Sequence, residues 1–190
     1  MPTQQKIIII TAPSGAGKTT ITHYLLKNIP QLSFSISATT RQKRGYEKEG
    51  ADYYFISPEE FRQRIQRNEF AEWEMVYEGK YYGTLKAELE RAWKENKTPL
   101  LDIDVKGAIH VQRQYPETSL SIFIQPPSID ELKKRLEARG TESEATLNAR
   151  LNKAAYELSF KDEFDKIIIN KNLDQACKEV EEIVKSFIGN

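Results

Sequence analysis

The sequence feature that most constrains the fold lies near the N-terminus, where four consecutive isoleucines lead into a glycine-containing loop. Residues 7–10 are all β-branched, which predicts a strand buried on both faces. Residues 21–27 predict a helix, and the loop before them ends in Gly-Lys-Thr. A strand, a loop of this kind and a helix form the context of a phosphate-binding loop. The loop residues are Ala12, Pro13, Ser14, Gly15, Ala16, Gly17, Lys18 and Thr19.

This loop has the chemistry to bind a nucleoside triphosphate. Gly15 and Gly17 allow close approaches that a Cβ would forbid, so that successive N–H groups can point at phosphate oxygens. Lys18 supplies a point charge for the β- and γ-phosphates, the Thr19 hydroxyl is placed to ligate Mg²⁺, and the helix N-terminus adds partial positive charge. Ala12 stands where the strict pattern has glycine, but alanine is small. The alternative is a glycine-rich turn without function.

Composition limits the function classes. The chain has 190 residues, which predicts one domain, and its 28 basic and 28 acidic residues give a formal net charge of zero. A neutral chain argues against a general nucleic-acid-binding or membrane surface. The single Cys177 excludes an intrachain disulfide, and the sequence has no apolar run of transmembrane length. We therefore expect a cytoplasmic protein.

The order of the predicted elements indicates an α/β fold. Strands predicted at 99–104, 120–124 and 166–169 are separated by helices, which implies a parallel sheet covered on both faces. A helix is expected to open at Thr84. By contrast, residues 33–82 predict mostly short β elements, beginning with alternation of Leu32, Phe34 and Ile36, and they resemble an insertion.

Two aspartates follow one of these core strands. Asp102 and Asp104 lie two apart, so in a strand they would share a face at its carboxyl end, where open α/β sheets bind ligands. One could serve the Mg²⁺ shell and the other a substrate. The alternative is that one of them caps the next helix.

Arginines form two further groups. Arg41 and Arg44 lie three apart in a loop, where paired guanidinium groups suit a second phosphate. Arg135 and Arg139 lie four apart on one helix face and Arg150 follows, so they could close over a transferring phosphoryl group. For Arg41 and Arg44 the alternative is a solvated basic loop. For the second group the alternative is a charged solvent face with glutamate partners, since Glu131 lies four residues before Arg135.

Separated motifs in a characteristic order resemble the guanylate kinase family over nearly the whole chain. They are the loop at 12–19, Ser-Ala-Thr-Thr-Arg-Gln-Lys-Arg at 37–44, Phe-Ala-Glu-Trp at 70–73, Tyr-Tyr-Gly-Thr at 81–84, Leu-Asp-Ile-Asp-Val-Lys-Gly at 101–107, Pro-Pro-Ser at 126–128, the segment 132–142, Ile-Asn at 169–170 and Leu-Asp at 173–174. The resemblance implies a P-loop NTPase three-layer sandwich with a five-stranded parallel sheet, a β-rich GMP-binding insertion and a helical lid. It also implies a core at 1–32, 85–134 and 157–190, an insertion at about 33–84 and a lid at about 135–156.

The resemblance assigns two substrates to this site. It implies phosphoryl transfer from ATP to GMP, and to dGMP, with Mg²⁺, in a monomer or homodimer. The GMP phosphate would contact Arg41, Arg44, Tyr53 and Tyr82, and the base would contact Ser37, Glu72, Thr84 and Asp104. Asn170 would help to seat adenine, Asp102 would be an outer-shell metal partner, and Lys18, Arg135, Arg139 and Arg150 would be catalytic. Chemistry agrees for the base, because a carboxylate such as Glu72 can accept from both guanine donors and a hydroxyl can donate to O6.

Two departures and two rival functions remain. The family usually has Arg-x-Gly-Glu where this chain has Arg44, Gly45, Tyr46 and Glu47, and the turn at 78–80 is about one residue longer, which favours Tyr82 over Tyr81 as the phosphate contact. One rival is a kinase for another monophosphate, and Glu72 together with Asp104 argues against it, because this rival predicts no carboxylate positioned to accept from the base. The other is a catalytically silent protein-binding module, for which an eroded phosphate loop would be expected.

Overall fold

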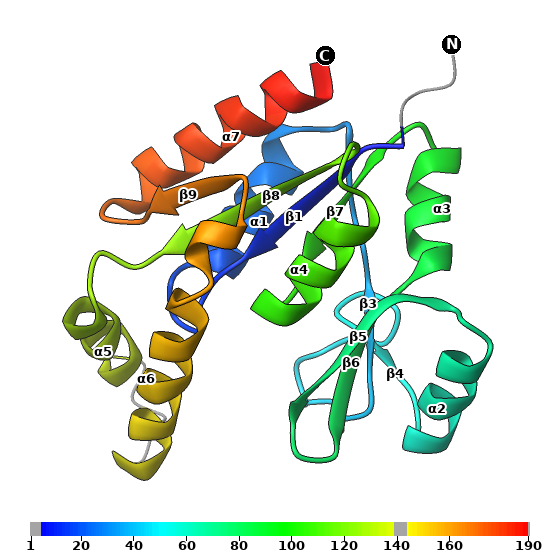
Figure 1. The fold of residues 1–190 in the computed structure, drawn as a ribbon, viewed down its shortest axis with the longest axis horizontal. Helices are drawn as coiled ribbons and strands as arrows, with labels where there is room; N and C mark the ends of the chain where they lie inside the picture. The colour runs from blue at the N-terminus through cyan, green and yellow to red at the C-terminus, as the bar shows by residue number, and fades with distance from the viewer. Residues whose placement is uncertain (1–4, 139–143, 190) are drawn as a thin grey trace.

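The computed structural model describes residues 5–138 and 144–189, and Figure 1 shows their arrangement. The strands are β1 (Ile7–Thr11), β2 (Leu32–Phe34), β3 (Ser37–Thr39), β4 (Tyr54–Phe55), β5 (Phe70–Tyr77), β6 (Lys80–Leu85), β7 (Thr98–Asp102), β8 (Ser119–Gln125) and β9 (Lys166–Ile169). The helices are α1 (Lys18–Asn28), α2 (Pro58–Gln66), α3 (Lys86–Lys94), α4 (Val105–Gln114), α5 (Ile129–Glu137), α6 (Glu144–Leu158) and α7 (Leu173–Gly189).

The main sheet has five parallel strands in the order β2-β7-β1-β8-β9. Its central strand, β1, is fully buried. Ile8 and Ile10 pack in the cluster that contains α1 and α7, whereas Ile7 and Ile9 pack in the cluster that contains α3 and α4. Because alternate residues of one strand face two different helical layers, the isoleucine run covers both faces. This arrangement confirms the predicted three-layer α/β sandwich (Figure 1).

A second sheet follows the order β4-β3-β6-β5 and lies apart from the main sheet in Figure 1. Its small core includes Phe61 of α2 stacked on Phe70 of β5, with ring centroids 4.4 Å apart. Helix α2 begins after an N-cap residue, Ser57, whose hydroxyl accepts from the Glu60 N–H at 3.1 Å. The hairpin between β5 and β6 turns at Gly79, whose φ is +69°.

Three sequence expectations about element boundaries were wrong. Thr84 does not open a helix, because it continues β6 opposite Ser37 and Glu72, and α3 starts at Lys86. The strand expected to reach residue 104 ends at Asp102. Asp104 is instead the N-cap of α4, where its Oδ1 accepts from the Gly107 N–H at 3.0 Å.

The third difference concerns the strand expected over residues 32–36. It is divided into β2, which pairs with β7 in the main sheet, and β3, which pairs with β6 in the second sheet. Residues 33 and 34 therefore lie in the main sheet, so the second sheet starts later than the expected insertion boundary. The lid boundaries expected at 135 and 156 fall inside α5 and α6, and the division into core, insertion and lid stays a prediction.

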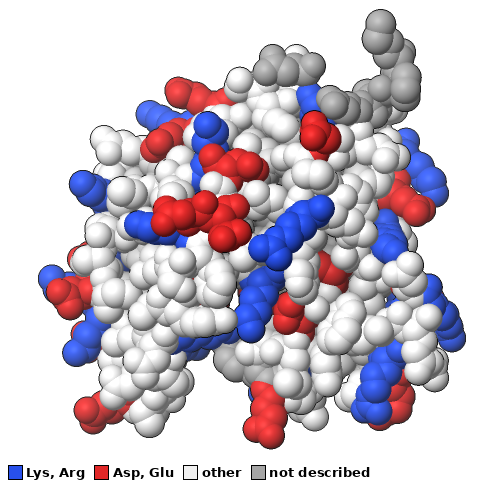
Figure 2. Space-filling model, in the orientation of Figure 1, with Lys and Arg blue, Asp and Glu red and all other residues white. Residues whose placement is uncertain are grey.

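The surface matches the neutral composition. Figure 2 shows positive and negative side chains interspersed over the face that it presents. Among residues 5–138 and 144–189, no helix is long and apolar enough to cross a membrane.

Candidate active site

The phosphate-binding loop leaves the carboxyl end of β1 and enters α1 in the conformation that its glycines permit. Gly15 and Gly17 have φ values of +91° and +102°, a region unfavourable to other residues. A Cβ on Gly17 would lie 2.4 Å from Nδ2 of Asn170. That buried amide donates to the Ala16 carbonyl at 2.8 Å, so it supports the loop from behind. A direct contact of Asn170 with ATP stays a prediction.

Lys18 is held beside the end of β7. Its ammonium forms an ion pair with Asp102 and donates to the Ile103 carbonyl at 3.2 Å. The other oxygen of Asp102 accepts from the Thr22 hydroxyl at 3.3 Å. Thr19 and Asp102 line one cleft, and their oxygen atoms are of the kind that Mg²⁺ prefers together with waters and substrate phosphates. The described residues contain no cluster of three His, Cys, Asp or Glu side chains able to hold a metal.

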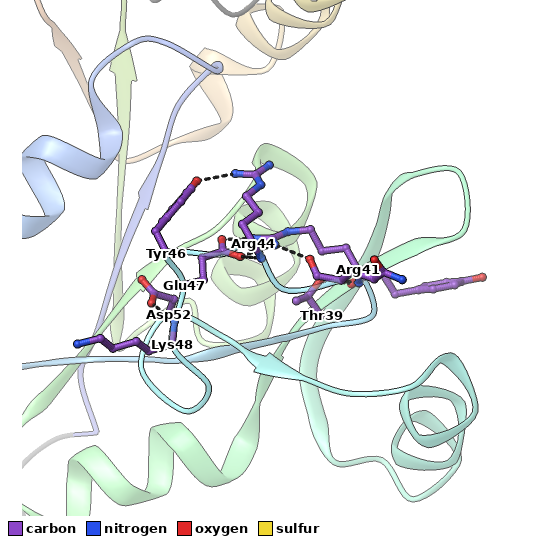
Figure 3. A network of polar contacts seen from close by, with 9 residues as sticks. Thr39, Arg41, Arg44, Tyr46, Glu47, Lys48 and Asp52 are labelled. Atoms are coloured by element: carbon purple, nitrogen blue, oxygen red, sulfur yellow. Dashed lines mark hydrogen bonds and ion pairs between the residues drawn. The ribbon is translucent and has the colours of Figure 1, made fainter.

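The loop after β3 presents the two predicted phosphate arginines, as Figure 3 shows. Both oxygens of Glu47 accept from Arg41, one of them at 2.7 Å, and Glu47 also accepts from the Arg44 N–H at 2.8 Å. The paired guanidinium lowers the pKa of Glu47 to about 2. The same contact raises the pKa of Arg41, whose guanidinium lies 5.0 Å from the Tyr53 ring centroid. Arg41 is therefore a charge in a fixed position.

A narrower pocket of about 150 Å³ adjoins this loop, lined by Ser37, Glu72, Tyr82 and Asp104 among others. Glu72 is 7% exposed and accepts from the Thr84 hydroxyl at 2.6 Å. Burial raises the pKa of Glu72 to about 7. A buried carboxylate beside hydroxyl groups forms a site for a planar ligand with adjacent N–H donors.

The arginines of α5 and α6 have different environments. Arg135 forms an ion pair with Glu131 at 3.3 Å and donates to the Asn170 carbonyl at 3.0 Å, so the structure does not bring it to the cleft. The predicted Glu131 partner is confirmed. Arg150 does line the cleft. Arg139 lies outside the described residues, and so does Gly140, where a glycine after a helical pattern predicts the helix end.

One cleft of about 410 Å³ unites these parts, between the phosphate-binding loop, the loop after β3 and α6. It brings together predicted residues that lie far apart along the sequence. They are Ala12, Pro13, Ser14, Gly15, Gly17, Lys18, Thr19, Arg41, Arg44, Tyr53, Tyr82, Asp102, Asp104 and Arg150. Tyr81 instead packs against the Phe61 ring, 5.5 Å between centroids, in the core of the second sheet.

Comparisons with known proteins agree with the resemblance found in the sequence. The family model described as guanylate kinase matches residues 4–187. A guanylate kinase from Bacteroides fragilis is 50% identical over 98% of this chain and 91% of that relative, and one from Thermotoga maritima is 46% identical over 95% and 86%. The chain belongs to the guanylate kinase family.

Solved structures agree with the family assignment. The crystal structure of guanylate kinase from Anaplasma phagocytophilum superposes with a TM-score of 0.79 at 32% identity, covering 97% of this chain and 86% of that one. A shikimate kinase from Bacteroides thetaiotaomicron superposes with a TM-score of 0.51 at 12% identity over 95% and 98%, which shows a similar fold alone.

Three residues that contribute to the candidate active site were not assigned a role from the sequence. Glu47 holds both phosphate arginines, and its sequence signals are its place at the end of the family's Arg-x-Gly-Glu pattern and its position as an acid in a basic loop. Glu157 lines the cleft and is 8% exposed, and burial raises its pKa to about 7. Its spacing of seven from Arg150, which places both on one helix face, could have identified it. Gly107 belongs to the family motif at 101–107, but the motif did not indicate its role, which is that a Cβ there would lie 2.6 Å from Oε2 of Glu72.

Proposed function

We propose that this protein transfers the γ-phosphoryl group of ATP to GMP and releases ADP and GDP. The observation that carries the proposal is the single cleft in which Lys18 of the phosphate-binding loop faces the same space as Arg41 and Arg44. Two phosphate sites that share one cleft suit direct transfer between two nucleotides. A covalent intermediate is not required.

The donor site is built from the loop at 12–19. Its backbone N–H groups and Lys18 hold the β- and γ-phosphates. Asn170 stabilises the loop conformation through its hydrogen bond to the Ala16 carbonyl. Thr19 would hold Mg²⁺, and Asp102 would be a partner further from the ion. When bound, the ion neutralises charge on the β- and γ-phosphate oxygens. Lys18 must leave Asp102 and turn toward the phosphates when ATP binds.

The acceptor site has a phosphate end and a base end. Arg41, Arg44, Tyr53 and Tyr82 hold the GMP phosphate. Ser37, Glu72, Thr84 and Asp104 recognise guanine, with the ionised Glu72 accepting from N1–H and the exocyclic amine. Adenine reverses this donor and acceptor pattern, so it would leave a buried carboxylate without a partner.

In the transfer step, an oxygen of the GMP phosphate attacks the γ-phosphorus in line. The new P–O bond forms as the bond between the γ-phosphorus and the β–γ bridging oxygen breaks, and the electron pair leaves on ADP. Lys18 and the lid arginines 135, 139 and 150 stabilise the equatorial oxygens. For Arg135 this role requires exchange of its contacts with Glu131 and Asn170.

Related properties belong to the same proposal. We expect dGMP to be a second acceptor, since the proposed contacts involve phosphate and base. The protein would act in purine nucleotide metabolism and GMP recycling in the cytoplasm, as a monomer or homodimer.

A coupled assay of ADP release tests the function, with GMP, AMP, CMP and dTMP offered in turn. We expect turnover with GMP, and a loss of at least about 100-fold in kcat for Lys18→Ala, scaled from the removal of one preorganised charge. Absence of GMP-dependent turnover would contradict the proposal and favour a silent binding module.

The assignment of Glu72 has its own test. We expect Glu72→Gln to reduce discrimination between GMP and AMP much more than it changes the KM for ATP. Unchanged base selectivity together with a weaker apparent affinity for ATP would show that Glu72 does not recognise guanine.

A further inference from the structure

Tyr46 is a residue of the loop after β3 whose place in the structure is not explained by packing. It stands where the family resemblance leads one to expect glycine, yet its side chain is 76% exposed. The backbone tolerates it, because the non-glycine residues with positive φ in the described part of the chain are Asn68 and Asn96. A Cβ added to the neighbouring Gly45 would have no other atom within 4 Å, so the loop is open around Tyr46.

The Tyr46 side chain reaches one of the two phosphate arginines. Its hydroxyl oxygen accepts from Nη1 of Arg44 at 3.2 Å, and Figure 3 shows the ring and the guanidinium turned toward each other. The Arg44 backbone is fixed separately, by the contact of its N–H with Glu47. Tyr46 therefore orients the end of a side chain whose base is already held.

The two phosphate arginines differ in how their charge is balanced. Arg41 is paired with both oxygens of Glu47, whereas no ion pair of Arg44 is found among the described residues. Arg44 thus keeps its whole charge for a ligand, but a long side chain without a partner loses rotamer entropy when it binds. A neutral hydroxyl can reduce that loss without neutralising the charge.

We propose that Tyr46 is a positioning residue that holds the Arg44 guanidinium ready for the acceptor phosphate. The inference rests on the proposed function, since it assumes that Arg44 binds the phosphate of GMP. Tyr46 acts through Arg44 and not on the base, and it contributes to binding more than to the transfer step. At a position where the family resemblance leads one to expect glycine, this chain therefore has a side chain that supports the phosphate site.

The test compares the binding of GMP and of guanosine to the full chain by calorimetry, for the wild type and Tyr46→Phe. We expect GMP to bind about 2- to 5-fold more weakly to Tyr46→Phe, which is the lower part of the range for ordering one side chain on binding, with guanosine unaffected. In steady state the KM for GMP should rise by a similar factor while kcat and the KM for ATP stay constant. Tyr24→Phe is the matched control, because its hydroxyl donates to Glu181 at 2.7 Å between α1 and α7.

A double-mutant cycle identifies the route of the effect. In an Arg44→Ala background, Tyr46→Phe should change GMP affinity by less than about 1.5-fold, because the group through which it acts is absent. An undiminished effect in that background, an equal effect on guanosine, or no effect in the wild type would overturn the inference. Failure of the wild type to bind GMP at all would instead contradict the proposed function.

Discussion

At the scale of single residues, the buried carboxylate of Glu72 makes GMP binding sensitive to pH. Burial raises its pKa to about 7 in the free protein, so it is mostly protonated at pH 6. Only the ionised form accepts from both guanine donors, and binding must therefore release a proton below the pKa. We expect the dissociation constant of guanosine to be about 10-fold higher at pH 6 than at pH 8.

Guanosine is the suitable probe because it has no phosphate that titrates in this range. Glu72→Gln is the control, and its weaker binding should be independent of pH between 6 and 8. Calorimetry in buffers of different ionisation enthalpy would also detect the released proton. A flat profile for the wild type would mean that the Glu72 carboxylate is not the group that meets the base.

Residue types were easier to predict than the contacts that hold them. The family resemblance assigned Arg41 and Glu72, and chemistry agrees with both, because phosphates suit guanidinium groups and guanine donors suit a carboxylate. The partners that fix these groups come from elsewhere. Thr84 reaches Glu72 through strand pairing, and Glu47 reaches Arg41 through a loop whose course has no periodic pattern.

At the scale of elements, the fit of α4 against β5 protects the base pocket. Gly107 lies in the first turn of α4, and a Cβ there would lie 2.6 Å from Oε2 of Glu72 and 3.1 Å from its Cδ. We expect Gly107→Ala to displace the carboxylate and raise the KM for GMP by about 10-fold, a cost near 1.4 kcal/mol, with the KM for ATP unchanged. Steady-state kinetics with each substrate varied in turn would measure this.

The matched control is Gly189→Ala, because it is a helical glycine with no atom within 4 Å of an added Cβ. Alanine favours a helix over glycine by about 1 kcal/mol, so loss of helix α4 cannot account for the expected effect. Equal KM values for GMP in the two variants would show that Glu72 moves aside without cost.

Boundaries of elements were predictable where the signal is local. Ser57 and Ser128 are each followed three residues later by glutamate, which is a local signature of a helix start. They do cap α2 and α5, since each hydroxyl accepts from an N–H three residues later. Thr84 looks similar in sequence but pairs with Ser37, which is distant along the chain. From the sequence alone, Asp104 is compatible with the end of a strand and with a helix cap. The structure decides for the cap, because β7 ends at Asp102 and α4 starts at Val105.

At the scale of the whole molecule, the cleft is lined by three parts that approach it from different sides. Lys18 comes from the phosphate-binding loop, Arg44 from the loop after β3, and Arg150 from α6 (Figure 1). In the free protein Lys18 is paired with Asp102. Bound phosphates place negative charge between positive side chains that come from separate walls, and this attracts the walls toward each other. We therefore expect the second sheet and α6 to approach the main sheet when both nucleotide sites are filled.

GMP and ADP with Mg²⁺ form a pair that cannot transfer a γ-phosphoryl group, so they allow this closure to be measured at equilibrium. We expect the radius of gyration from small-angle X-ray scattering to fall when both are present, and to fall less with either one alone. Arg44→Ala removes one of the facing charges, so it should reduce the change caused by the pair without changing the size of the free protein. If neither the pair nor its components alter the scattering of the wild type, the arginines act across a cleft of fixed width. In that case water exclusion during transfer must come from the nucleotides themselves.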